Sequence, residues 1–231
     1  MGSLYDAHRD RYASDLDRAV RFSGKAHQFF TRRKAEELLA LVERHLGPPR
    51  DQAVLDVGSG IGLTDELLAG RFGSLTGVDV SPGVLERAAA RNPSVPYEQY
   101  DGDRLPYADG VFDVVFAVCV VQVLPQAQRP PFVAELARVT RGGGLVAVFE
   151  HNPYNPLTRL AVRRFSLGHD AKMLAARELV RLFRSAALAV VQRAHVVLLP
   201  SDARAARAVE QALARLPLGA QYVVAGRRCG A

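Results

Sequence analysis

The fold of this 231-residue chain can be inferred from the segment Val54-Leu55-Asp56-Val57-Gly58-Ser59-Gly60-Ile61-Gly62. Its mainly apolar start is typical of a buried strand, and the closely spaced glycines predict a turn that leads into a helix. Glycine suits a loop in which the backbone takes positive φ and a ligand comes close to the main chain. The stretch therefore predicts a strand at Ala53–Asp56, a ligand-binding turn and a helix at Thr64–Gly70.

Strands and helices alternate on both sides of this turn. On the N-terminal side, apolar residues at three- and four-residue spacing predict a helix at Thr31–Leu46. On the C-terminal side, the alternation indicates right-handed crossovers and a parallel sheet covered by helices on both faces, so the fold class is α/β. The further strands are expected at Leu75–Asp79, Val95–Tyr100, Phe112–Val120, Leu145–Glu150, Val190–Leu199 and Gln221–Ala225, and the further helices at Pro82–Arg91, Ala127–Val139, Leu174–Ala187 and Ala203–Leu216.

The length of the chain suits one well-buried domain, because single cores serve chains of about 100–250 residues. We expect a single domain over residues 1–231 with four parts. These are an N-terminal helical cap (1–47), a cofactor-binding core (48–150), a connection or lid without clear periodicity (151–173), and a part that completes the sheet with helix and strand (174–231).

The composition excludes several classes of protein. With 48% hydrophobic and 23% charged residues, the chain is neither disordered nor collagen-like. Cys119 and Cys229 are too few for a disulfide framework, and no cysteine–histidine cluster has metal-binding spacing, so no metal is expected. No apolar run reaches the roughly 18 residues of a membrane span, and the start MGSLYDAHRD lacks a signal core. We therefore expect a cytoplasmic protein without a membrane partner.

The net charge of +6 is distributed unevenly. Residues 51–150 hold seven basic and thirteen acidic side chains, whereas residues 151–231 hold thirteen basic and four acidic ones. The basic excess consists mainly of scattered arginines without a lysine-rich stripe or stacked aromatics, so nucleic acid is not an expected partner. The acidic middle suits a cationic cofactor, and the basic third suits an anionic acceptor.

Three aspartates lie at the ends of consecutive predicted strands. Asp56 comes before the glycines, where it would repel a pyrophosphate, and a nicotinamide-dinucleotide fingerprint would also need glycine at Leu63. Asp79, at the end of the next strand, can accept both hydroxyls of a ribose, and Asp101 can accept a hydrogen bond from an adenine amino group. Each aspartate alone is more often a turn residue. Together they lie in the crevice where open α/β sheets bind ligands.

Four segments resemble, in order and spacing, the successive motifs of class I S-adenosylmethionine (SAM)-dependent methyltransferases, most closely the small-molecule group called type 11. The resemblance implies a Rossmann-like three-layer sandwich whose seven-stranded sheet is mostly parallel with an antiparallel last strand. It also implies SAM as the cofactor and S-adenosylhomocysteine as the product. The four segments are LDVGSGIG (55–62), GVDVSPGVLERA (77–88), YDGDRLPYADGVFDVV (100–115) and RVTRGGGLVAVFE (138–150).

The resemblance further implies which residues bind this cofactor. The glycine turn and the end of the fourth strand would approach the methionine part, and Asp56 would lie near its ammonium. The second strand would hold the ribose through Asp79, and the third would hold the adenine. The expected cofactor-binding residues are Asp56, Gly58, Ser59, Gly60, Asp79, Val80, Asp101, Gly102 and Val118.

Methylation of oxygen or nitrogen in a small molecule, such as a natural-product intermediate, is the expected reaction. Methyltransferases acting on nucleic bases or protein amides usually carry Asn/Asp-Pro-Pro-Tyr where this chain has Val118-Cys119-Val120-Val121. Many relatives carry a His-His pair where this chain has Gln122-Val123. The basic C-terminal third keeps an RNA or protein methyltransferase as an alternative, and the missing His pair keeps a non-catalytic SAM-binding protein. We expect a monomer or homodimer.

Two histidines are candidates for a general base. His151 follows the fifth predicted strand at the cofactor edge, although a histidine there could also bond its own turn. His27 lies where the N-terminal helices of such enzymes fold over the pocket. Arg159, Arg163 and Arg164 are expected on a solvated face, with binding of a carboxylate or phosphate as the second interpretation.

Overall fold

The computed structural model describes residues 12–20, 26–164, 172–198, 201, 203, 209, 212–214 and 216–230, and these include one seven-stranded sheet. The strand order is β3-β2-β1-β4-β5-β7-β6. Strands β1 to β5 pair in parallel, and β7 runs antiparallel between β5 and β6, which confirms the predicted sheet. The strands are β1 (Ala53–Val57), β2 (Ser74–Asp79), β3 (Tyr97–Gln99), β4 (Phe112–Val118), β5 (Thr140–His151), β6 (Leu188–Val196) and β7 (Gln221–Arg228).

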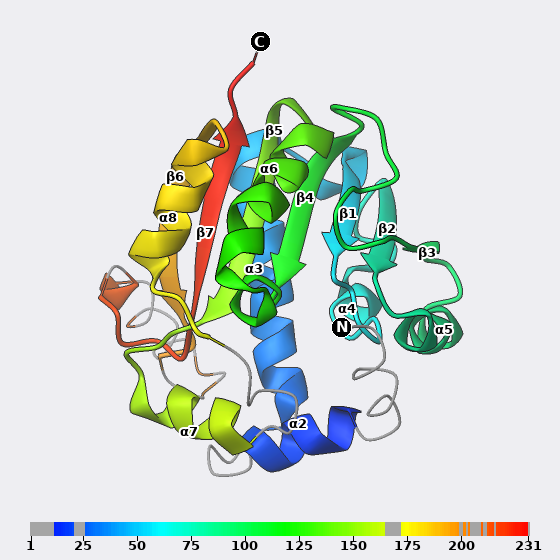
Figure 1. Cartoon of the computed structure of the whole chain (residues 1–231). Helices are drawn as coiled ribbons and strands as arrows, with labels where there is room; N and C mark the ends of the chain where they lie inside the picture. The colour runs from blue at the N-terminus through cyan, green and yellow to red at the C-terminus, as the bar shows by residue number, and fades with distance from the viewer. Residues whose placement is uncertain are drawn as a thin grey trace.

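Helices cover both faces of the sheet, as Figure 1 shows. Helices α6 and α8 share a core with Val115 and Val148, whereas α3 shares the opposite core with Phe116 and Phe149. Successive side chains of a strand point to opposite faces, so neighbouring residues of β4 and β5 enter different cores. The helices are α2 (Tyr12–Val20), α3 (His27–Leu46), α4 (Asp65–Leu68), α5 (Pro82–Arg91), α6 (Arg129–Val139), α7 (Pro156–Arg164) and α8 (Ala176–Ser185).

The carboxyl ends of β1, β2 and β4 meet at one edge of the sheet, the lower edge in Figure 1. Strand β1 lies between β2 and β4, so the chain continues to one side through β2 and β3 and to the other through β4 and β5. The loops diverge at such a switch point and leave a crevice in which open α/β sheets bind ligands. The topology therefore positions the candidate site over the loops after β1, β2 and β4.

Two helices of the expected N-terminal cap also reach this edge. Helix α2 packs beside α7 below the sheet, and α3 runs from the same edge across the back of the sheet (Figure 1). Residues 1–11 and 21–25 of the cap lie outside the described part of the chain.

The structure differs from the sequence predictions in three segments. The predicted irregular connection at 151–173 contains α7, whose outward leucines hide the helical period because only Thr158 and Val162 of this helix are buried. Strand β5 begins five residues before the predicted start, because Thr140 already pairs with Phe112. The glycines at 142–144 lie in an irregularity before regular pairing resumes at Leu145. Most of the helix predicted at 203–216 lies outside the described residues.

Candidate active site

The glycine turn after β1 is fastened to the end of β2. The N–H groups of Gly58 and Ser59 both donate to the carbonyl of Val78, at 2.8 and 3.0 Å. The N–H of Gly60 donates to Oδ2 of Asp79 at 3.0 Å, and the N–H of Ser81 donates to Oδ1 at 3.0 Å. Both carboxylate oxygens of Asp79 thus accept a main-chain N–H, which fixes this carboxylate at the end of β2.

The outer surface of this turn is open. Gly60 has a φ of +54°, and a Cβ added there would meet nothing within 4 Å. Gly58 differs, because an added Cβ would lie 2.5 Å from the side chain of Val120. The Oγ atom of Ser59 is buried and has no partner among the described residues. The turn therefore presents bare backbone at Gly60, with the buried and unpartnered hydroxyl of Ser59 beneath it.

The loop after β3 meets the end of β2 at Val80 and Gly102. A Cβ added to Gly102 would lie 3.3 Å from the Val80 side chain, so glycine permits this approach. Oδ1 of the neighbouring Asp101 accepts the N–H groups of Asp103 and Arg104, both at 2.9 Å, and these bonds lower its pKa. Asp101 is therefore an ionised turn residue, and its contact with a ligand stays a prediction.

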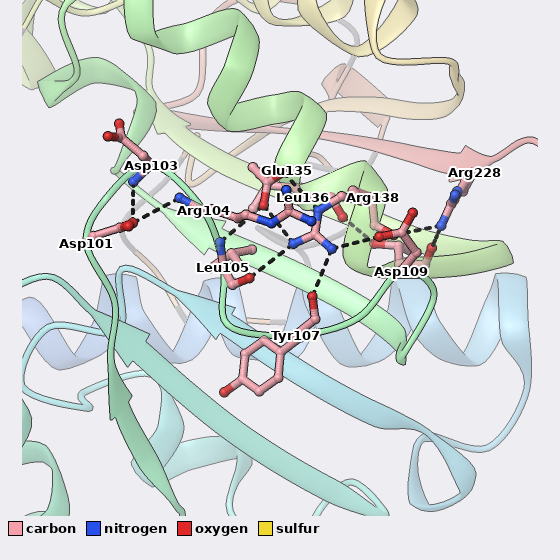
Figure 2. Close-up of polar contacts among 11 residues, drawn as sticks. Asp101, Asp103, Arg104, Leu105, Tyr107, Asp109, Glu135, Leu136, Arg138 and Arg228 are labelled. Carbon is pink, nitrogen blue, oxygen red and sulfur yellow. Dashed lines mark hydrogen bonds and ion pairs between the residues drawn. The ribbon is translucent and has the colours of Figure 1, made fainter.

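Figure 2 shows how α6 holds the loop over residues 101–110. The guanidinium of Arg138 donates to the carbonyls of Leu105 and Tyr107 at 3.1 and 2.8 Å, and pairs with Asp109 at 2.8 Å. Glu135 binds the other side of the guanidinium and also accepts the N–H of Leu105 at 3.1 Å. The loop that carries Asp101 is therefore braced by a charged pair from a rigid helix.

Asp56 lies inside the protein beneath the glycine turn, 2% exposed. Burial, followed by the adjacent Asp65 carboxyl, raises its pKa well above the usual range. Burial also raises the pKa of Asp65 to about 6, opposed by a hydrogen bond from the hydroxyl of Tyr97 at 2.8 Å. Burial and the neighbouring carboxyl therefore both favour the protonated form of Asp56. The expected contact of Asp56 with a ligand ammonium stays a prediction.

The ends of β4 and β5 bring a second polar group to the same edge. Nδ1 of His151 lies 2.9 and 3.1 Å from the amide nitrogen and oxygen of Gln122, and 3.6 Å from Sγ of Cys119. Burial, and then the ammonium of Lys34, lower the pKa of His151 to about 4. His151 is therefore neutral at pH 7, and its Nε2 makes no hydrogen bond with the described residues.

Glu150 supports this arrangement from below. Its Oε1 accepts the N–H groups of Val121 and Gln122 at 2.7 and 3.3 Å, while its fully buried Oε2 has no partner among the described residues. Burial raises the pKa of Glu150 well above the usual range. Glu150 therefore fixes the turn at 121–123, from which Gln122 reaches His151.

The structure pairs the other candidate, His27, with Asp17 of α2. Both the N–H and Nδ1 of His27 lie 2.8 Å from Oδ1 of Asp17, so the contact joins α2 to the start of α3. No hydrogen bond or ion pair joins His27 to His151 in the described part of the chain. A catalytic role of His27 stays a prediction.

Sequence reasoning missed three residues here. Lys34, on the inward side of α3, is 8% exposed and has no carboxylate partner in the described part of the chain. Cys119 directly follows β4 and has a φ of +60°, an unusual conformation for a residue other than glycine. Asp65 was hidden inside a predicted helix. Of these three residues, only Lys34 could have been found from the sequence, as a lysine among apolar helix positions. The backbone conformation of Cys119 and the pairing of Asp65 with another carboxyl have no sequence signature.

The described residues contain no group of three or more His, Cys, Asp or Glu side chains that could hold a metal ion. Within the same residues, no helix is long and apolar enough to cross a membrane.

Residues 55–148 match the family model described as "Methyltransferase domain". The demethylmenaquinone methyltransferase of Mycolicibacterium vanbaalenii is 35% identical over 158 residues, which cover 68% of this chain and 63% of that protein. The phosphatidylethanolamine N-methyltransferase of Cereibacter sphaeroides is 37% identical over 108 residues, covering 44% of this chain and 52% of that protein. The chain spans about half the length of the curated relatives it matches.

Solved structures share the fold. A SAM-dependent methyltransferase of Thermotoga maritima, a possible histamine N-methyltransferase, has a TM-score of 0.69 at 18% identity and covers 99% of this chain and 100% of its own. The geranyl diphosphate C-methyltransferase of Streptomyces coelicolor, solved with S-adenosylhomocysteine, has a TM-score of 0.60 at 16% identity, with 84% of this chain and 78% of that chain covered.

Proposed function

From the class I SAM-dependent methyltransferase domain that this chain carries, we propose that the protein transfers a methyl group from SAM to an oxygen or nitrogen atom of a small molecule, such as a natural-product intermediate. The acceptors named in relatives, demethylmenaquinone and phosphatidylethanolamine, belong to those proteins but support an organic small molecule here.

The fixed carboxylate of Asp79 is the observation that carries the proposal. Main-chain N–H groups hold both of its oxygens in place at the carboxyl end of β2, where a carboxylate suits the two hydroxyls of a ribose. Beside it, Gly60 offers open backbone and Ser59 an unpartnered hydroxyl, so the residues present fit SAM. When bound, SAM supplies a methyl group on a cationic sulfur.

Calorimetric titration with SAM tests the proposal. We expect saturable binding by the full chain and a loss of affinity of at least about tenfold in Asp79→Ala, corresponding to about 1.4 kcal/mol. Asp51→Ala, which removes an exposed carboxylate next to the amino end of β1, is the matched control and should bind as the parent does. Absence of saturable binding of either SAM or S-adenosylhomocysteine would refute the proposal.

The acceptor side of the site is proposed around His151. During transfer, a bond forms between the acceptor atom and the methyl carbon while the bond from that carbon to sulfur breaks, so the residues mainly have to orient the reactants. The neutral imidazole of His151 takes the proton of the acceptor hydroxyl or amine at Nε2, while Gln122 holds Nδ1. Such a base contributes roughly 10²–10⁴-fold to the rate.

Paired histidine variants separate the two candidate bases. His151→Ala is expected to lower kcat by about a hundredfold or more with little change in SAM affinity. His27→Ala removes the contact with Asp17 and should mainly lower the melting temperature. A large loss of kcat in His27→Ala but not in His151→Ala would identify His27 as the base.

The ammonium of Lys34 supports an anionic acceptor. Lys34 is 8% exposed and has no carboxylate partner in the described part of the chain, so a carboxylate, phosphate or phenolate of the acceptor would supply its counter-ion. Anionic acceptors should therefore show a lower KM than their amides or esters, and Lys34→Met should remove this preference.

The basic region 151–231 favours RNA as the second candidate acceptor. Salt-sensitive RNA binding followed by methylated RNA would support it over a small molecule. Tight SAM binding without any methylated product would instead favour a non-catalytic SAM-binding protein.

A further inference from the structure

Exposed apolar side chains gather on two segments at the active-site edge. Nine large hydrophobic side chains are exposed among the described residues, and five of them belong to the segments 154–160 and 216–218. Isolated exposed leucines are normal, but such a concentration marks an interaction surface. We call these five residues the apolar rim: Tyr154 (55% exposed), Leu157 (57%), Leu160 (39%), Leu216 (47%) and Leu218 (48%).

Hydrogen bonds hold the two segments of the apolar rim side by side. Four bonds tie the start of α7 to the carbonyls of residues 217–220, so the exposure of these leucines belongs to a fixed surface. The bonds run from Asn152 Nδ2 to Pro217 (2.9 Å) and Gly219 (2.8 Å), from Asn155 Nδ2 to Leu218 (2.8 Å), and from Thr158 Oγ1 to Ala220 (2.9 Å).

Arginines lie among the apolar side chains. In α7 only Thr158 and Val162 are buried, so Arg159 and Arg163 point outward together with the leucines of this helix. Both arginines are exposed and form no ion pair with the described residues. Leucine combined with unpaired guanidinium groups on one helix is the pattern of a helix that lies in the headgroup region of a bilayer.

We propose that the apolar rim, together with Arg159 and Arg163, docks the protein on the surface of a bilayer that contains anionic lipids. Leucine and tyrosine side chains enter the boundary between headgroups and acyl chains, and the guanidinium groups bind lipid phosphates. The prediction of no membrane partner came from the lack of a spanning segment, which does not bear on peripheral contact.

The position of the apolar rim connects membrane docking to the acceptor site. This connection rests on the proposed function. Helix α7 follows the end of β5 and begins five residues after His151, so a docked protein holds its acceptor side close to the bilayer. A lipid acceptor would then reach the imidazole without crossing open water.

Co-sedimentation of the full chain with lipid vesicles tests the inference, without SAM or any acceptor. We expect binding to phosphatidylcholine vesicles that contain phosphatidylglycerol, weaker binding in high salt, and little binding to phosphatidylcholine alone. Leu157→Ser/Leu160→Ser and Arg159→Gln/Arg163→Gln should each weaken binding by about tenfold. Their matched controls, Leu67→Ser/Val111→Ser and Arg177→Gln/Arg181→Gln, change exposed residues elsewhere and should bind as the parent does.

The same preparations show which results overturn the inference. Equal vesicle binding by the rim variants and their controls, or no binding to anionic vesicles at low salt, would refute it. Gel filtration in which the parent is a dimer and the leucine variant a monomer would assign the rim to a second copy of the chain. Binding of an acidic carrier protein but not of vesicles would assign it to that protein. None of these outcomes depends on SAM titration, so this inference and the proposed function fail separately.

Discussion

Gly60 combines a backbone requirement with an open approach for a ligand. An alanine there would adopt a left-handed conformation at a cost of about 1–2 kcal/mol, and its methyl group would project into empty space above the turn. Gly60→Ala should therefore fold, yet bind SAM at least about tenfold more weakly by calorimetry. Gly70→Ala is the matched control, because Gly70 has a φ of +71° and nothing within 4 Å of an added Cβ. Equal SAM affinities in the two variants would contradict a role of Gly60 in binding.

Lys34 acts on His151 through space. Removing the ammonium in Lys34→Met takes away one of the two causes that lower the pKa of His151, so this pKa should rise above about 4. It should stay below the ordinary 6.5, because burial is the larger cause. Lys34→Arg keeps the charge and serves as the control. NMR titration of the imidazole measures both variants, and an unchanged pKa in Lys34→Met would place the ammonium away from the ring.

The pKa of His151 also sets the pH dependence of activity. A base must be unprotonated, so kcat should fall with decreasing pH only near pH 4, rather than near the 6.5 of an ordinary histidine. In Lys34→Met this limb should move to higher pH. An acidic limb near 6.5 in the parent would exclude His151 as the base.

At the scale of elements, α6 controls the loop after β3 through Arg138. Arg138→Met removes the bonds to two loop carbonyls and the pairs with Glu135 and Asp109, so the loop over 101–110 should exchange its amide hydrogens faster. SAM affinity is expected to fall several-fold, because the Asp101 turn is no longer held. Arg91→Met, which breaks an exposed pair with Glu66, is the control. Faster exchange without any loss of SAM affinity would show that the loop does not contact the cofactor.

At the scale of the whole molecule, Asp65 links stability to pH. Its pKa rises from 3.8 to about 6 on folding, so the folded state holds the proton more tightly than the unfolded state. The resulting destabilisation is absent below pH 3.8, grows between 3.8 and about 6, and is complete above 6. Asp65→Asn can still accept a hydrogen bond from the Tyr97 hydroxyl. It removes this destabilisation and should stabilise the protein at pH 7.5 by about 3 kcal/mol.

Thermal or urea unfolding at two pH values measures this effect. The gain from Asp65→Asn should be smaller at pH 5 than at pH 7.5 by on the order of 1 kcal/mol. Asp103→Asn, at an exposed aspartate, controls for the loss of one negative charge. A gain from Asp65→Asn that is the same at both pH values would contradict the raised pKa.

Local sequence patterns are sufficient to predict the sheet and the position of its binding edge. Buried β-rich runs, glycine turns and strand-end aspartates are local patterns, and each reports where the chain turns at the carboxyl end of a strand. These patterns predicted six strands within a few residues of their bounds, and they placed the start of β5 five residues too late. They also assigned Gly60 and Asp79 to one binding edge, where the structure joins them by a hydrogen bond.

The protonation states of the buried side chains and the location of the apolar rim depend on contacts that form only in the folded chain. Asp56 is neutral because Asp65 lies against it in a dry interior, and His151 is neutral because burial and a lysine from α3 oppose its charge. The apolar rim exists because Asn152, Asn155 and Thr158 bind a segment some sixty residues away. Desolvation and contacts between distant segments depend on which residues become neighbours, and a linear pattern does not contain that information.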